Sequence, residues 1–147
     1  MNPTPALHLK AFQAPKEGQP PETCQDSWMA LGHNQPRGGP IRLAISDGAT
    51  TTAFSSLWAR LLVEAATRGI APWTKASYRA SKLPMLRRWW RDGALAGLPD
   101  PLPWYTEASL DRGAFATLLR VKIHRGAWEA EAWGDTCLFH MRSGKLL

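Results

Sequence analysis

Two aspartates, Asp26 and Asp47, are the residues of this sequence best suited to hold a divalent metal ion. Asp47 directly follows a strand-like apolar run at 41–46 (IRLAIS), and Asp26 begins a second such run at 26–31 (DSWMAL). The turn-rich segment 33–40 (HNQPRGGP) between the two runs predicts an antiparallel hairpin with a long loop. At the open end of such a hairpin the first strand begins beside the end of the second, so both carboxylates should meet there.

The symmetric register of this hairpin places Leu31 opposite Arg42 and Asp26 opposite Asp47. The Cβ atoms of directly opposed residues are about 5 Å apart, and like charges at that distance destabilise the pair. A cation would relieve the repulsion, and carboxylate oxygens suit the hard ions Mn²⁺ and Mg²⁺. Gly48 adds a backbone carbonyl that no Cβ shields. Alternatively, Asp47 only starts the turn and Asp26 only caps the other end.

Two amphipathic helices are expected to support the hairpin. The first spans about 52–68, with the threonines at 50–52 as its N-cap and Gly69 at its C-terminal end. A second helical stretch restarts at Pro84 and stops at Gly93. The apolar residues of the first helix follow the helical repeat: Phe54, Leu57, Trp58, Leu61, Leu62 and Ala65.

After a Pro-rich linker at 98–103, the period changes to that of strands. Strands are predicted at 115–123, 128–133 and 137–142, and a tight turn at 143–144. Only three residues, two of them apolar, follow this turn. The sequence therefore looks cut short, and we expect the C-terminal part of the fold to be missing.

The sequence also predicts which side chains of the C-terminal strands are exposed to solvent. Glu129 and Glu131 alternate on one strand face and are expected to be solvated. An incomplete sheet should leave an unpaired edge, with Phe139, Leu146 and Leu147 on an exposed apolar surface. We therefore expect concentration-dependent self-association.

Length and composition restrict the class of protein. The chain has 147 residues and 44% hydrophobic content, which fits one globular domain. No run approaches the roughly 20 apolar residues needed to span a bilayer. Cys24 and Cys137 are expected to be reduced, buried thiols, and we infer a cytoplasmic protein. Residues 1–22 are Pro-rich and aperiodic, which predicts a flexible arm before a domain at 23–147.

The net charge of +6 raises the alternative of nucleic-acid binding. Arginines and tryptophans alternate at 87–91 (RRWWR), a composition that could neutralise phosphates and stack on bases. Leu83, Leu86, Trp89 and Trp90 recur at helical spacing, however, which favours a core-facing stripe with solvated arginines. Nucleic acid is therefore the less favoured partner.

Several segments resemble the metal-dependent serine/threonine phosphatases of the 2C type (PPM-type), and in particular a bacterial branch of that family. The similarity covers residues 23–147, and the ordered set is more specific than any single motif. The segments are 46–49 (SDGA), 54–60 (FSSLWAR), 102–105 (LPWY) with 113–119 (GAFATLL), and 133–139 (WGDTCLF).

The resemblance implies an α+β fold of the α/β-sandwich kind, with two mainly antiparallel sheets packed face to face and helices outside. It implies hydrolysis of phosphoserine and phosphothreonine in proteins, with Mn²⁺ or Mg²⁺ as cofactor and a Ser/Thr kinase as possible partner. By position in the motifs, Asp47 matches the bridging ligand, Gly48 the carbonyl ligand and Asp26 the second acid of a Glu-Asp pair. Asp135 matches the ligand of an additional, weaker metal site.

Three departures from the family pattern predict weak or absent turnover. Gln25 replaces the glutamate of the Glu-Asp pair, no arginine precedes Arg37 to hold a phosphate, and no acid follows Asp135. Metal affinity depends on the number of charged ligands. Three hypotheses remain: a phosphatase of the 2C type, a pseudo-phosphatase or regulatory binding module, and a basic, Trp-rich nucleic-acid binder.

Overall fold

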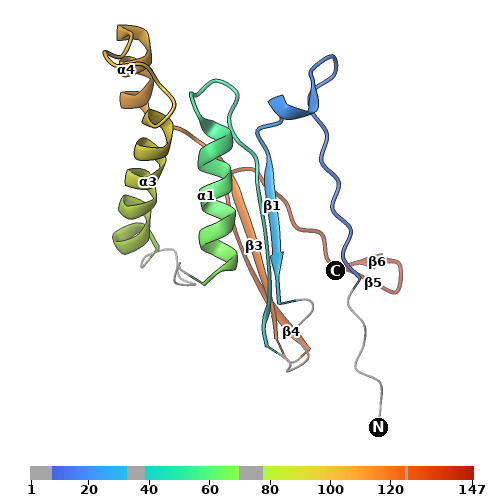
Figure 1. Ribbon diagram of the computed structural model, residues 1–147. Coiled ribbons are helices and arrows are strands. Elements are labelled where there is room, and N and C mark those ends of the chain that lie inside the picture. Colours follow the sequence, from blue (N-terminus) through green and yellow to red (C-terminus); the bar gives the residue numbers. More distant parts are fainter. Residues whose placement is uncertain (1–7, 33–38, 70–77, 125) are drawn as a thin grey trace.

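The computed structural model describes residues 8–32, 39–69, 78–124 and 126–147 (Figure 1). Its fold is α+β, and the main antiparallel sheet has the strand order β1-β2-β3-β4. These strands are β1 (Ser27–Leu31), β2 (Ile41–Ser46), β3 (Leu118–His124) and β4 (Ala127–Trp133). The α-helices are α1 (Ser55–Thr67), α3 (Leu83–Leu95) and α4 (Trp104–Arg112). Two shorter helical segments are the 3₁₀ helix η1 (Pro21–Thr23) and the π-helix η2 (Tyr78–Lys82). A separate hairpin consists of β5 (Met141–Arg142) and β6 (Lys145–Leu146).

The predicted pairing of the first two strands is confirmed. β1 pairs antiparallel with β2, and Leu31 lies opposite Arg42 as expected. The same register places Asp26 opposite Asp47, immediately beyond the last paired residues. Most of the predicted turn, residues 33–38, lies outside the described residues.

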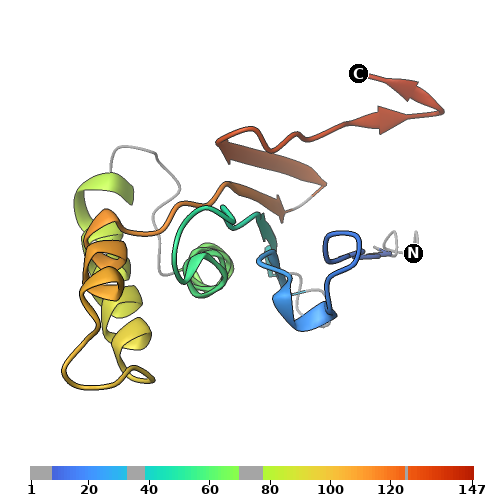
Figure 2. The ribbon, with the colours of Figure 1, turned by 90° about the horizontal axis from the view of Figure 1, so that it is seen from above.

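Helix α1 packs on one face of the sheet. Helices α3 and α4 lie on the side of α1 that faces away from the sheet (Figure 2). The buried stripe of α1 includes Trp58, Leu62 and Val63, which join the core with Ala44 of β2. The sheet thus has one face covered by helix, which is the arrangement that an amphipathic helix produces.

The predicted start of this helix is wrong, although its predicted end is right. Phe54 precedes the helix in the left-handed region, with φ 55°, and its side chain provides no capping hydrogen bond. The hydroxyl of Thr52 instead donates to Ala49 O at 3.1 Å and accepts from Phe115 N at 3.3 Å. Because that hydroxyl fixes the preceding turn to the segment before β3, it does not cap the helix. Gly69 follows the helix with φ +72°, as predicted.

Helix α3 continues through Gly93 to Leu95, so the predicted stop is wrong. A Cβ on Gly93 would lie 3.2 Å from Leu57 Cδ2, which means that the glycine permits close approach of α1 and α3. The buried positions are Leu86, Trp90 and Ala94, four residues apart. Trp89 is 44% exposed, which contradicts its predicted place in the core.

The solvated state expected for Glu131 is also wrong. Its carboxylate pairs with Arg120 on the neighbouring strand, including a bond from Nε to Oε2 at 3.0 Å. Arg120 is fully buried and its guanidinium lies 5.1 Å from the centre of the Trp133 ring. Glu129 remains exposed and pairs with Lys122. The alternation of side chains along the strand correctly predicted that both glutamates lie on one face. Their side chains differ in exposure, 24% for Glu131 and 56% for Glu129.

The predicted strand at 137–142 is mostly absent, since only Met141–Arg142 pairs, within the β5–β6 hairpin. The chain leaves β4 at Gly134, whose φ of +87° turns it away from the sheet. Ser143 and Gly144 both have positive φ, as the predicted tight turn requires. Cys137 is exposed, which contradicts the buried thiol expected from the sequence.

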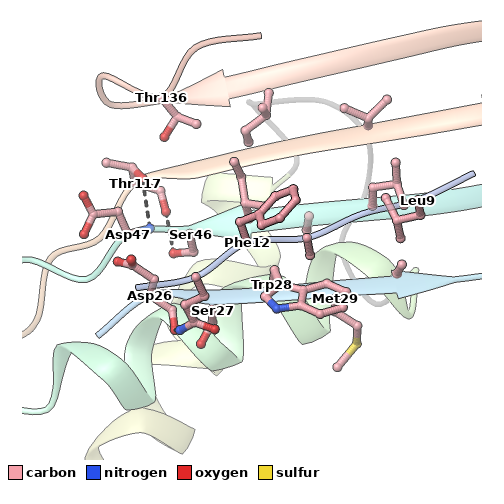
Figure 3. Close-up of a pocket in the computed structure, with 18 of the residues that line it drawn as sticks. Leu9, Phe12, Asp26, Ser27, Trp28, Met29, Ser46, Asp47, Thr117 and Thr136 are labelled. Atoms are coloured by element: carbon pink, nitrogen blue, oxygen red, sulfur yellow. Dashed lines mark hydrogen bonds between the residues drawn. The ribbon is translucent and has the colours of Figure 1, made fainter. Parts of the chain in front are cut away.

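The other face of the main sheet is apolar and open. The residues that point away from α1 include Trp28, Ala30, Leu43, Ile45, Leu119 and Val121. Residues 9–13 cross this face and border a groove of about 420 Å³ (Figure 3). Phe12 on this segment is 91% exposed, so it covers little of the apolar surface.

Candidate metal site

Asp26 and Asp47 lie side by side at the open end of the β1–β2 hairpin (Figure 3). Asp26 directly precedes β1, and Asp47 directly follows β2, so the strand register fixes their proximity. Burial and the carboxyl group of Asp26 both raise the pKa of Asp47. Two carboxylates held this close repel one another when both are charged.

Thr117, which directly precedes β3, holds the backbone of Asp47 through two hydrogen bonds. Asp47 N donates to Thr117 Oγ1 at 3.1 Å, and Thr117 N donates to Asp47 O at 2.9 Å. The hydroxyl of Ser46 also donates to Thr117 O at 2.6 Å. These bonds fix the point from which the Asp47 side chain projects, and such preorganisation favours a binding site.

Gly48 is required by close packing. A Cβ at this position would lie 2.7 Å from Gln25 O and 3.0 Å from Ser55 O. Gly48 also forms an isolated antiparallel bridge with Ala116, and the two hydrogen bonds belong to the flanking residues. In this pattern the carbonyl of Gly48 points away from residues 115–117. The sequence predicted that the Gly48 carbonyl could approach an ion, but it did not predict this packing constraint.

The pKa of Asp47 is raised above its usual value. Loss of hydration at the strand end is the largest cause, followed by the close approach of the Asp26 carboxyl group and the negative charges of Asp26 and Asp135. The ammonium of Lys16 acts in the opposite direction and lowers the pKa. The end of the hairpin is therefore a region of unbalanced negative charge, of the kind that a divalent cation would neutralise.

Asp135 contributes charge to this region but does not complete a ligand set. Within the described ranges, no three His, Cys, Asp or Glu side chains converge closely enough to hold one metal ion. The structure therefore brings two of the predicted carboxylates together and places the third within electrostatic range only.

Gln25 and Lys16 are neighbours of the site whose contacts the sequence did not predict. Gln25 Oε1 accepts a hydrogen bond from the buried Ser55 hydroxyl at 2.6 Å, which ties the site to the first residue of α1. Lys16 Nζ donates to Thr50 Oγ1 at 3.3 Å, which places a cation near Asp47. The N-terminal segment has no hydrophobic period that could have revealed this contact.

A second contact ties the N-terminal segment to the metal-site residues. Gln13 Nε2 donates to the backbone carbonyl of Asp26 at 2.8 Å. Cys24 Sγ lies 3.6 Å from Asp26 Oδ2 and is also contacted by Gln13. These contacts place Gln13 and Cys24 beside Asp26.

Replacing Asp47 with asparagine should stabilise the metal-free protein at neutral pH. Because the pKa of Asp47 is raised, the folded state keeps this proton to a higher pH than the unfolded chain does. Stability from this group is fully present below the usual pKa of 3.8 and is lost as pH rises through the raised pKa. In EDTA at pH 7, Tm should be higher for Asp47→Asn than for the unchanged protein, and the difference should shrink on acidification. A lower Tm for the variant at pH 7 would contradict the repulsion.

Comparisons with known proteins give no family assignment. No family model matches this chain, and no curated protein or solved structure matches it either. Across the part of the chain that the structure describes, none of the helices has both the length and the apolar character needed to cross a membrane. A functional assignment must therefore come from the residues of the site.

Proposed function

We propose that this chain carries part of a metal-dependent serine/threonine protein phosphatase of the 2C type. The observation that carries the proposal is the pairing of Asp26 with Asp47, where the mutual repulsion of two carboxylates calls for a cation. The proposed fold is the α/β sandwich of that family, of which the sheet and α1 would form one half. The proposed substrates are phosphoserine and phosphothreonine proteins in the cytoplasm, made by a cognate kinase.

In this proposal Asp26 and Asp47 hold Mn²⁺ or Mg²⁺ together with the carbonyl of Gly48, and Asp135 serves a weaker site. The ion, when bound, supplies an activated water and a positive charge for the phosphate. Asp47 would orient the site because Thr117 fixes its backbone. Lys16 is the cation of the described chain that acts on Asp47, so it would also attract a phosphate.

One observation favours a pseudo-phosphatase or regulatory module as the second candidate. At the position where the family has a metal-binding glutamate, Gln25 is neutral and its side-chain oxygen is engaged by Ser55. Since the amide of Gln25 carries no charge, the site offers less negative charge for two ions than a glutamate there would give. We therefore expect this chain to turn over phosphomonoesters weakly or not at all.

Millimolar Mn²⁺ should raise the Tm of this protein. Binding to the folded state alone stabilises it by about 1.4 kcal/mol when the metal is at ten times its Kd. For a domain of this size that is a shift of roughly 3 to 6 °C. Asp47→Asn should lose the shift, whereas Lys122→Ala, on β3 and paired with Glu129, should keep it. A Tm that does not respond to Mn²⁺ would overturn the metal site.

A hydrolysis assay then separates the two candidates. The substrates would be p-nitrophenyl phosphate and a phosphothreonine peptide in Mn²⁺, with Asp47→Asn as the inactive reference. Metal binding without turnover supports the regulatory module. Robust turnover that is lost in Asp47→Asn would support an enzyme and refute the expected weakness.

A further inference from the structure

A groove of about 270 Å³ lies between α3, the end of α4 and the segment that enters β3. Its floor consists of the buried side chains of Trp58, Trp90 and Leu110, and exposed arginines form its rim. Trp90 is held in place because its Nε1 donates to Phe54 O at 3.1 Å. The three arginines on the rim are Arg87, Arg91 and Arg112.

The rim carries more positive than negative charge. Asp111 is the one carboxylate among the described residues that line the groove. It pairs with Arg91 at 3.3 Å, and the two side chains are 65% and 47% exposed. Arg112 Nη2 donates to Ser109 Oγ at 3.0 Å, which positions its guanidinium without neutralising it. Arg87 makes no hydrogen bond or ion pair with any residue in the described ranges. Guanidinium groups bind carboxylate and phosphate oxygens, often in a bidentate manner.

One short segment connects this groove to the aspartate pair. Phe115 lines the groove, and its carbonyl accepts from Ala49 N at 2.9 Å. Thr117, two residues later, is the residue that fixes Asp47. Two extended residues span at most about 7 Å, so an extended polypeptide at Asp47 would reach the groove within a few residues.

We propose that Arg87, Arg91 and Arg112 form a second, anion-binding site that holds an acidic side chain of the same polypeptide whose phosphorylated residue lies at Asp47. The proposal deepens the proposed function, on which it rests, by assigning a preference for phosphoproteins with acidic residues near the phosphorylated one. The volume suits a single side chain, since it falls just below the usual range of ligand pockets.

Single-stranded nucleic acid fits the groove less well. Stacking on bases needs aromatic rings with exposed faces, but Trp58 and Trp90 are 6% and 5% exposed. Among the described residues that line the groove, Phe115 is the one exposed aromatic residue. One exposed ring offers a poor platform for successive bases.

Fluorescence anisotropy with a labelled phosphothreonine peptide flanked by glutamates would test the proposal. The titration would be done in EDTA at low salt, so that binding does not depend on a metal. Removing one charge-assisted contact should weaken binding about tenfold in Arg87→Gln, and again in Arg112→Gln. Arg88→Gln is the matched control, because Arg88 is an exposed neighbour on α3 that does not line the groove. Each variant's Tm would verify folding.

The peptide and the variants distinguish the possible results. A peptide with glutamines in place of the flanking glutamates should bind about tenfold more weakly. Equal losses in Arg87→Gln and Arg88→Gln would overturn the site. Tighter binding of an oligothymidylate, lost in Arg87→Gln, would instead assign the groove to nucleic acid. Retained peptide binding without any Mn²⁺ shift would overturn the phosphatase proposal and leave the acidic-peptide site standing.

Discussion

Replacing Glu131 with glutamine should lower the free energy of unfolding by about 3 kcal/mol. Glu131 is the carboxylate that pairs with Arg120, whose side chain is completely shielded from water. Without the negative charge, a guanidinium remains in the interior with a neutral partner, and its lost hydration is no longer compensated. Because small domains are stable by only about 5 to 15 kcal/mol, chemical denaturation should show a large decrease in the midpoint.

The neighbouring cross-strand pair provides a matched control. Glu129 and Lys122 lie on the same two strands and are 56% and 28% exposed. Water screens this pair, so Glu129→Gln should change stability by less than about 1 kcal/mol. Equal losses for the two variants would show that burial of Arg120 does not determine the effect.

A double replacement tests whether the pair itself stabilises the fold. Arg120→Met with Glu131→Leu removes both charges and keeps apolar volume, a change that is often neutral or stabilising in other proteins. We expect it to recover most of the stability lost in Glu131→Gln. Failure to recover would mean that other contacts of Arg120, such as the ring of Trp133, dominate.

The hairpin and its register could be predicted because the sequence carries them locally. Two apolar runs on either side of a turn-rich segment admit one symmetric pairing, and this pairing brings Asp26 to Asp47. The end of α1 was predictable for the same reason, since Gly69 provides the left-handed conformation that a helix end favours.

The missed features depend on contacts between distant segments. The sequence alone predicts a helix stop at Gly93, because the packing of Leu57 from α1 against this glycine becomes visible only in the structure. The pair of Arg120 with Glu131 depends on the depth of burial at one position of a sheet, which alternation does not reveal. Lys16 lies in a segment without periodicity, so no pattern linked it to Asp47.

Helix α4 was also absent from the predicted elements. It begins directly after Pro103, where the sequence suggested only the end of a Pro-rich linker. Its single buried residue is Leu110, so it shows no extended apolar stripe. A helix with so little buried surface shows only a weak hydrophobic periodicity, so this pattern did not predict α4.

Concentrated solutions of this chain should contain associated molecules. The sheet face opposite α1 is apolar, and Trp28 and Ile45, directly paired on it, are each 46% exposed. β4 forms one edge of the sheet, and among the described residues no further strand pairs with it. An apolar face beside an unpaired edge favours contact between two copies.

The exposed C-terminal residues add to this surface. Phe139, Leu146 and Leu147 are 71%, 63% and 68% exposed, as the sequence predicted. They lie on or next to the β5–β6 hairpin, which projects from the main sheet (Figure 2). A second copy would cover apolar surface that the chain's own described residues leave in contact with water.

Sedimentation velocity from about 10 to 500 µM should therefore show the weight-average mass rising toward twice the monomer mass or beyond, as expected for an interface of moderate area. Ile45→Lys should suppress this rise, because a charge on the open face would have to be buried in the contact. Trp104→Lys is the matched control, since Trp104 is also exposed but lies on α4, far from that face. A monomer at every concentration, with one cooperative unfolding transition, would contradict the prediction. If Trp104→Lys suppressed the rise in mass and Ile45→Lys did not, the contact between copies would involve α4 and not the open face of the sheet.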